Sequence, residues 1–174
     1  FFYDIDTMRW GDSPEDEGCA KVYYFEEGTE LHETDIPKEL DEEFIVPEFA
    51  IGMKKHVSLP YYEDFCKMDT IDKEIKDVYE SDEFDYFDVV SEAGYDIDEY
   101  GENTKILGYP DIIQDSMEFE NEDRILLFEM GTIGDEDSGY ELMWGDCGHI
   151  YFWIKKQDLK ESKFDKVWLI LQCG

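Results

Sequence analysis

The chain has 174 residues, 47 acidic against 15 basic, which gives a formal net charge of −32 at pH 7. A field of this sign repels phosphate backbones and anionic lipid headgroups, so it argues against direct binding to nucleic acid or to a membrane surface. Apolar residues make up 42% and aromatic residues 16% of the chain, which excludes a disordered acidic tail. We therefore expect a folded protein whose acidic surface either keeps it in solution or meets a basic partner.

The sequence shows no apolar run of about 18 residues, the length of a membrane-spanning helix, and no charged start followed by an apolar run of the secretory kind. The four cysteines are scattered and form no C-x-x-C pair: Cys19, Cys66, Cys147 and Cys173. This spacing favours reduced thiols with a packing role, and we expect a cytoplasmic protein. Its oligomeric state is left open.

Residues 1–60 have the pattern of short strands joined by turns. Phe1–Ile5 is aromatic and β-prone, residues 11–18 favour turn geometry, and Lys21–Phe25 follows as a second predicted strand. Pro47 makes a central strand unsuitable around it, because proline has no N–H to donate. Since a strand needs a neighbour, the strand-like opening predicts that part of the fold precedes residue 1 and pairs with Phe1–Ile5.

Residues 61–104 change to a helical and loop connection. One helix is predicted to begin at Asp69 or Thr70, because apolar residues follow at helical spacing: Ile71, Ile75, Val78 and Tyr79. A second helix is predicted from Ser81 or Asp82 to Gly94, a residue that ends helices because it accepts positive φ. Residues 94–104 are predicted as loop.

Residues 105–174 are predicted as the second β half, and residues 124–174 carry the clearest β pattern. Arg124–Met130 and Tyr140–Trp144 are predicted strands separated by a loop rich in glycine and aspartate. Ile150–Ile154 and Val167–Leu171 are apolar on both alternating faces, as expected of strands covered on both sides. We predict a contiguous antiparallel unit in which these two runs are central strands.

These elements predict one mainly β domain over residues 1–174, roll-like and antiparallel with a few short helices, for which α+β is the alternative label. The block Trp10–Asp12 before Val22–Phe25 resembles Trp144–Asp146 before Ile150–Trp153. The similarity reflects either an internal duplication or a coincidence between two aromatic hairpins, and both readings stay open.

The two Trp-Gly-Asp blocks supply the candidate ligand-binding residues, which are Trp10, Asp12, Trp144, Asp146 and His149. A structural role is the favoured reading, with Asp146 bonded to turn amides and Trp144 packed in the core. On one strand Cys147 and His149 would face the same side, which allows a nucleophile–base pair. A packed thiol beside a strand-end imidazole is the simpler alternative.

The sequence predicts no catalytic residue, no metal site and no cofactor. The three histidines are far apart, and no second Cys/His pair completes a zinc site. Asp96–Asp98 and Asp135–Asp137 begin like calcium loops, but Tyr100 and Gly139 stand where an oxygen ligand is needed. There is neither a phosphate-binding glycine loop nor a G-x-S-x-G nucleophile elbow.

Four blocks in sequence order carry a family resemblance: Lys105–Gln114, which reads K-x-x-G-Y-P-x-x-I-Q; Leu126–Met130; Met143–Gly148 with Tyr151–Ile154; and Phe164–Cys173. Together they resemble the YwqG-like family of uncharacterised bacterial proteins, in which the second block reads closer to L-L-L-Q-I-D. The resemblance implies a mainly β, roll-like fold with a few helices and a further segment before residue 1. It implies no activity.

Two classes of function follow. The first is a binding or regulatory module whose acidic surface meets a basic partner, such as an immunity-type protein or a nucleic-acid mimic, and it is favoured because no catalytic constellation is present. The second is a small-ligand binder or enzyme with an aromatic cleft between duplicated β halves, carrying Asp146. A contiguous acidic face favours the first, and a buried aromatic cleft with a convergent carboxylate and histidine favours the second.

Overall fold

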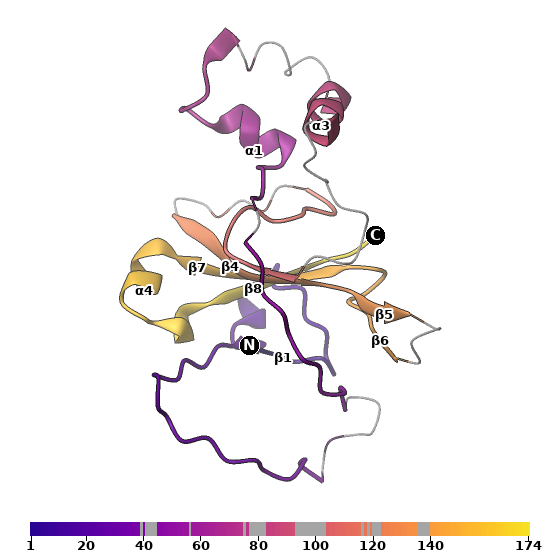
Figure 1. Cartoon of the computed structure of the whole chain (residues 1–174), viewed down its shortest axis with the longest axis vertical. Coiled ribbons are helices and arrows are strands. Elements are labelled where there is room, and N and C mark those ends of the chain that lie inside the picture. Colours follow the sequence, from indigo (N-terminus) through magenta and orange to yellow (C-terminus); the bar gives the residue numbers. More distant parts are fainter. Residues whose placement is uncertain are drawn as a thin grey trace.

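A four-stranded antiparallel sheet with the strand order β3-β4-β7-β8 lies at the centre of the computed structural model (Figure 1). The structure describes residues 1–38, 40, 45–55, 57–74, 76, 83–92, 104–115, 117, 119, 123–135 and 140–174. The sheet strands are β3 (Thr104–Ile106), β4 (Arg124–Gly131), β7 (His149–Lys155) and β8 (Trp168–Gln172). Two smaller antiparallel pairs accompany it: β1 (Phe2–Tyr3) with β2 (Ala20–Lys21), and β5 (Ile133–Asp135) with β6 (Tyr140–Leu142).

Short helices complete the described part of the chain. They are α1 (Tyr62–Lys67), α3 (Glu83–Glu92) and α4 (Lys156–Lys160), with 3-10 turns η1 (Pro14–Asp16) and η3 (Phe164–Lys166). Helices α1 and α3 lie on the opposite side of the sheet from β1 (Figure 1). The fold is therefore mainly β with few helices, as predicted. No described helix is long and apolar enough to cross a membrane.

The central sheet has two differently built faces. On the first, which we call the core face, β7 and β8 place a cluster that includes Ile150, Phe152 and Leu171. Segments from the start of the chain pack against this cluster, among them Tyr3, Ile5, Cys19, Ala20 and Val22. The second, which we call the network face, carries Leu126, Tyr151 and Trp153 together with buried polar groups. Strand β7 is buried almost throughout because both of its faces are covered.

A β-bulge in β4 decides which residues reach which face. The register to β7 shifts between Leu126 and Phe128, so Leu127 and Phe128 both face the core face. A bulge re-aims every side chain beyond it, since strand side chains otherwise alternate. Because of the extra residue, Glu129 lies opposite Tyr151 on the network face instead of entering the apolar core.

The predicted strands are confirmed at β4, β7 and β8, with one correction. Val167–Leu171 was predicted as a central strand, but β8 is the last strand in the sheet order. Its outer edge is covered by a loop: Leu171 N–H donates to the Trp10 carbonyl at 2.9 Å, and Trp168 Nε1 donates to the Gly11 carbonyl at 2.8 Å. A loop that covers the edge of a strand shields the strand from water as a neighbouring strand would. An edge strand covered in this way therefore has the same apolar sequence pattern as a central strand.

Other predictions need correction in the first half of the chain. The predicted strand Lys21–Phe25 reduces to β2, and Tyr23, Tyr24 and Phe25 lie exposed without strand pairing. The loop predicted after β4 contains β5, and α1 was not predicted. The helix predicted to begin at Asp69 or Thr70 begins later, after Asp72, whose carbonyl accepts the Lys76 N–H at 3.0 Å.

The second predicted helix is confirmed as α3. Some predictions lie outside the described residues: those for Ile75, Val78, Tyr79, Gly94, the loop residues 94–103 and the calcium-loop comparison at Asp96–Asp98. Most of the comparison at Asp135–Asp137 lies outside them too.

Candidate functional site

The most distinctive local feature is a segment that leaves β3 and crosses the network face. After β3 the chain turns through Leu107 and Gly108, which have φ values of +63° and +89°. Gly108 also lies close to Ser58: a Cβ at this position would stand 2.3 Å from Ser58 Oγ. The Ser58 hydroxyl accepts the Tyr109 N–H at 2.8 Å, so the turn is joined to the segment that leads into α1.

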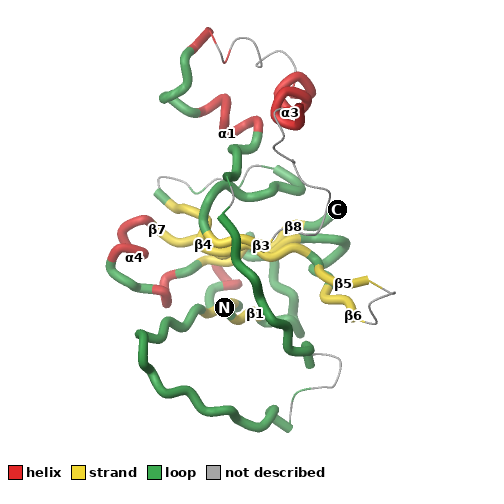
Figure 2. Tube along the Cα trace, in the orientation of Figure 1, coloured by secondary structure: helices red, strands yellow, loops and turns green. Residues whose placement is uncertain are grey.

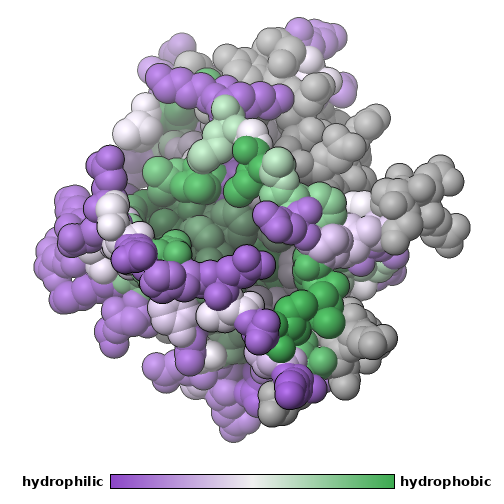
Figure 3. Space-filling view, turned by 60° about the horizontal axis from the view of Figure 1, so that its bottom comes forward, coloured by the Kyte–Doolittle hydropathy of each residue, from purple (hydrophilic) through white to green (hydrophobic). Residues whose placement is uncertain are grey.

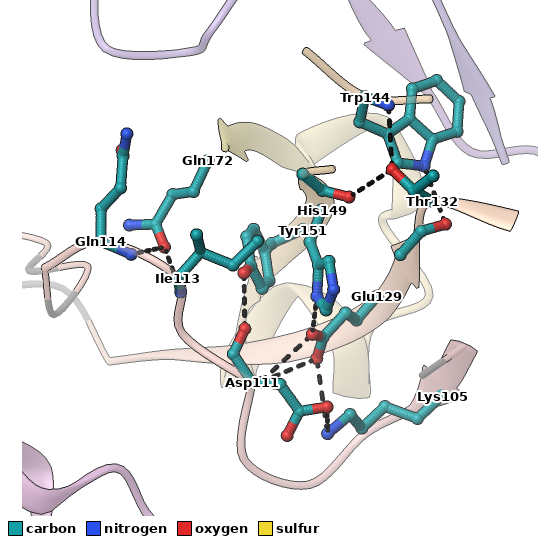
Figure 4. A network of polar contacts seen from close by, with 12 residues as sticks. Lys105, Asp111, Ile113, Gln114, Glu129, Thr132, Trp144, His149, Tyr151 and Gln172 are labelled. Carbon is teal, nitrogen blue, oxygen red and sulfur yellow. Dashed lines mark hydrogen bonds and ion pairs between the residues drawn. The ribbon is translucent and has the colours of Figure 1, made fainter. Parts of the chain in front are cut away.

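Beyond this turn, residues 109–115 are fastened to the sheet by a buried carboxylate. Glu129 of β4 is fully buried, with 0% exposure. Both of its oxygens accept the Asp111 N–H at 3.2 Å, and Oε1 accepts from His149 Nδ1 at 2.8 Å (Figure 4). The Lys105 ammonium from β3 lies 3.6 Å from Oε2 and forms an ion pair with Asp111. Side chains from three strands, β3, β4 and β7, therefore converge at the Glu129 carboxylate, to which the crossing segment is bonded.

The electrostatics of this cluster combine burial with opposite charges. Burial raises the pKa of the Glu129 carboxyl, because a low-dielectric surrounding disfavours its charged form. The hydrogen bond from His149 and the charge of Lys105 act in the opposite direction and limit the rise of this pKa. Burial also raises the pKa of Tyr151, whose hydroxyl stays protonated and donates to the Asp111 carbonyl at 2.6 Å.

Gln172 of β8 holds the far end of the same segment. Its Oε1 accepts the N–H groups of Ile113 and Gln114 at 3.2 and 3.3 Å, and its Nε2 donates to the Asp115 carbonyl at 2.9 Å. Gln114 Nε2 in turn donates to the Cys173 carbonyl at 2.8 Å. Buried backbone groups of an irregular segment need hydrogen-bond partners, and the side-chain amide of Gln172 bonds to three such groups. Residues 109–115 are thus a fixed part of the sheet surface.

One polar atom of the cluster has no partner among the described residues. His149 is 3% exposed, and its Nε2 makes no hydrogen bond there, whereas Nδ1 bonds to Glu129. An imidazole with its proton on Nδ1 leaves Nε2 as an acceptor. The other groups of the cluster hold the crossing segment in place. We call the set Lys105, Asp111, Glu129, His149, Tyr151 and Gln172 the clasp, because it positions this segment more than it forms an acid–base pair. Among the described residues, no group of three or more His, Cys, Asp or Glu is arranged to hold a metal ion.

The residues singled out by the sequence do not converge. Trp144 is buried, and its Nε1 donates to the Gly131 carbonyl at 3.1 Å. Trp10, Asp12 and Asp146 are exposed, and His149 is buried in the clasp. The Cys147–His149 pair does not form: Cys147 is exposed in a turn with φ of +51°, while the imidazole is directed to Glu129. The five candidate residues thus do not form one site, although His149 meets a buried carboxylate, that of Glu129.

The two Trp-Gly-Asp blocks nevertheless share a location, because both glycines pack against β8 and the residues that follow it. A Cβ on Gly11 would meet the Leu169 carbonyl oxygen, and a Cβ on Gly145 would meet Cys173 Sγ at 2.8 Å. Both glycines have positive φ, of +78° and +63°. The blocks thus resemble each other in backbone conformation and neighbour, although one tryptophan is buried and the other exposed.

Sequence reasoning singled out His149 but missed the other five residues of the clasp. They are Lys105, Asp111, Glu129, Tyr151 and Gln172. All five lie inside the four sequence blocks that carried the family resemblance. A further signal was available in Glu129, an acid within an otherwise apolar strand, since a charge is rarely buried unless it is paired.

Asp146→Ala should change the free energy of unfolding by less than about 0.5 kcal/mol, the usual range for a surface substitution. The expected side-chain bond to turn amides is not found: Asp146 is exposed, and in the described structure its hydrogen bond is from the Gly174 N–H to its backbone carbonyl, at 3.0 Å. Urea unfolding of the variant beside wild type measures this. Gly145→Ala is the matched comparison and should cost more, because its Cβ would meet Cys173. A loss of about 1–2 kcal/mol for Asp146→Ala would reinstate the predicted cap.

A family model described as a domain of unknown function, DUF1963, matches residues 1–173. A search of curated proteins gives no match to the chain. The match covers the clasp, both Trp-Gly-Asp blocks and the central sheet.

Proposed function

The chain belongs to the DUF1963 family, a domain of unknown function, and we propose that it is a binding module for a basic partner protein. The observation that carries the proposal is an extended, exposed loop segment that holds both apolar and acidic side chains. We propose the narrower assignment to the YwqG-like family on the four motif blocks of residues 105–174. We propose a cytoplasmic location as well, because its four unpaired cysteines suit a reducing compartment.

Residues 22–38 and 45–55 run as loop along one side of the molecule (Figure 2). Eight apolar side chains here are between 55% and 89% exposed: Tyr23, Tyr24, Phe25, Leu31, Ile36, Phe49, Ile51 and Met53. Six exposed acids lie among them against three exposed lysines: Glu26, Glu27, Glu30, Glu33, Asp35 and Glu48, with Lys38, Lys54 and Lys55. Figure 3 shows a hollowed face with hydrophobic residues bordered by hydrophilic ones. A large exposed apolar area with a polar border is typical of an interaction surface.

The negative charge of the chain favours a positively charged partner. With a net charge of −32, the surface attracts cationic proteins over long distances and repels anionic ones. Complementary charge chiefly speeds association and excludes wrong partners, while buried apolar contact supplies affinity. A partner that offers lysine or arginine together with apolar side chains would satisfy both parts of this segment.

Peptide binding tests the proposal. A fluorescent peptide of alternating lysine and leucine should bind, a lysine–serine peptide should bind more weakly, and a glutamate–leucine peptide should not bind. Replacing three acids together, Glu26→Gln, Glu27→Gln and Glu30→Gln, should weaken lysine–leucine binding by about tenfold, because exposed ion pairs contribute about 0.5 kcal/mol each. Fluorescence anisotropy at two salt concentrations gives the affinities.

The matched control neutralises three exposed acids on α1 and α3, across the sheet: Glu63→Gln, Asp88→Asn and Glu92→Gln. It has the same net charge as the test variant, so it separates a local surface from a general field. Equal weakening by both variants would contradict a localised binding surface. Absence of lysine–leucine binding to the wild-type chain would overturn the proposed function.

A further inference from the structure

One stretch of the chain, residues 45–55, lies open to solvent over its whole length. Each of its residues is exposed, and it contains no helix, strand or turn (Figure 2). Ile51 is 89% and Met53 82% exposed, and a Cβ on Gly52 between them would meet nothing within 4 Å. In the described part of the chain, no main-chain hydrogen bond outside helices and strands involves this stretch. Its backbone is therefore accessible to the cleft of another protein.

The open stretch ends on two adjacent lysines, Lys54 and Lys55, and both are exposed. An endoprotease cuts a chain segment only when that segment is released from helices, strands and turns, so folded elements must first open locally. Backbone burial and hydrogen bonding therefore decide where a native protein is cut. A protease pocket that carries an aspartate, as in trypsin, selects a basic side chain before the cleaved bond. The open stretch offers both an accessible backbone and that side chain.

Other exposed lysines lie in structure that would have to open before cleavage. Lys21 belongs to β2, and Lys160 is the last residue of α4. Lys38 lies in a turn closed by a hydrogen bond from the Leu40 N–H to the Pro37 carbonyl at 3.1 Å. An exposed lysine side chain is thus common on this surface, whereas an exposed lysine on an unbonded backbone is not.

We propose that Lys54–Lys55 is a processing site for an endoprotease of trypsin-like specificity, and that the cut chain stays assembled. In the reaction, water adds across the peptide bond after Lys54. The bond between the Lys54 carbonyl carbon and the Lys55 nitrogen breaks, the hydroxyl joins the carbon, and the proton passes to the nitrogen. The inference goes beyond the proposed function and does not depend on it.

The two parts of a cut chain stay together because the first part covers the core face. The Trp10 and Gly11 carbonyls accept hydrogen bonds from β8. The Tyr3 ring meets the buried Trp144 ring at 5.7 Å, and Ile5 packs against the same core cluster. Separation of the parts would return this apolar area to water, which is unfavourable.

Limited digestion with trypsin in native buffer, followed by intact-protein mass spectrometry, tests the inference. The first products should be two fragments that meet at Lys54–Lys55. They should elute together in size-exclusion chromatography and separate in urea. In the double variant Lys54→Gln, Lys55→Gln the intact chain should disappear at least about tenfold more slowly, because lysines in folded elements are cut only after local opening.

The matched control is the double variant Lys160→Gln, Lys166→Gln, which removes two other exposed lysines and the same charge. It should be cut at the wild-type rate. A first cut elsewhere, at Lys38 for example, or equal slowing in both double variants would overturn the site. Fragments that separate in native buffer would overturn the assembled state. Peptide binding does not enter this test, so its outcome is independent of the proposed function.

Discussion

Gly11→Ala should lower the free energy of unfolding by about 3 kcal/mol or more, combining backbone strain with a steric clash. Gly11 has a φ of +78°, and a Cβ there would lie 1.7 Å from the Leu169 carbonyl oxygen and 2.8 Å from its carbonyl carbon. Both atoms belong to the backbone of β8, so no side-chain rotation relieves the overlap. The loop would have to withdraw and lose the hydrogen bonds that the Trp10 and Gly11 carbonyls accept from Leu171 and Trp168.

Gly18→Ala is the matched control for this prediction. Gly18 has a similar φ of +89°, but nothing lies within 4 Å of the position that its Cβ would take. It should therefore cost only the left-handed backbone penalty of about 1–2 kcal/mol. Urea unfolding of both variants beside wild type measures the difference. Equal losses would show that Gly11 is not held against β8 as described.

The strands of residues 124–174 were predictable because their burial leaves a strong local pattern. Ile150–Ile154 is apolar at every position, and only a strand covered on both faces or a buried helix has that composition. The position of β8 was not predictable in the same way. The residues that cover its outer edge, Trp10 and Gly11, lie far away in the sequence, and a hydrophobic pattern reports burial without naming what does the covering.

For the aromatic run Val22–Phe25 the sequence predicted a strand that the structure does not form. Its β-prone side chains favoured a strand, yet only Ala20–Lys21 pairs with β1, and Tyr23 and Tyr24 are exposed. A strand depends on a partner for its hydrogen bonds, so propensity alone does not make one. The same exposed aromatic side chains form part of the proposed binding surface.

The sequence does not show that the residues of the clasp meet. The motif blocks contain all of them except His149, but the contact between Asp111 and Glu129 depends on the bulge between Leu126 and Phe128. Without the extra residue, alternation would turn Glu129 toward the apolar core face. No rule of sequence spacing places that bulge, so the pairing of Glu129 with His149 became visible only in the fold.

Glu129→Ala should be strongly destabilising, by about 3–5 kcal/mol, the scale for removing one partner of a buried charged pair. The substitution leaves the Asp111 N–H and His149 Nδ1 without their acceptor and takes a carboxylate away from Lys105. Glu129→Gln is the control, since its side chain keeps the volume and one acceptor oxygen. It should cost about 1–2 kcal/mol. Similar losses for both variants would mean that the side-chain charge, and not the acceptor, holds residues 109–115.

The comparison of wild type with Glu129→Gln also predicts how stability depends on pH, and the pKa shift of Glu129 fixes the sign. Because burial raises the pKa of Glu129 above its unfolded value of 4.5, the native state binds more protons than the unfolded state between the two pKa values. Stability falls with rising pH in that window, by at most about 1.4 kcal/mol per pH unit, and Glu129→Gln lacks this contribution. The stability of wild type minus that of Glu129→Gln should therefore be largest below the unfolded pKa, decrease as the pH rises between the two pKa values, and become constant above the raised pKa. Urea unfolding of both proteins across this pH range measures the difference. An increase with pH would show that Lys105 and His149 outweigh burial and hold the carboxylate ionised.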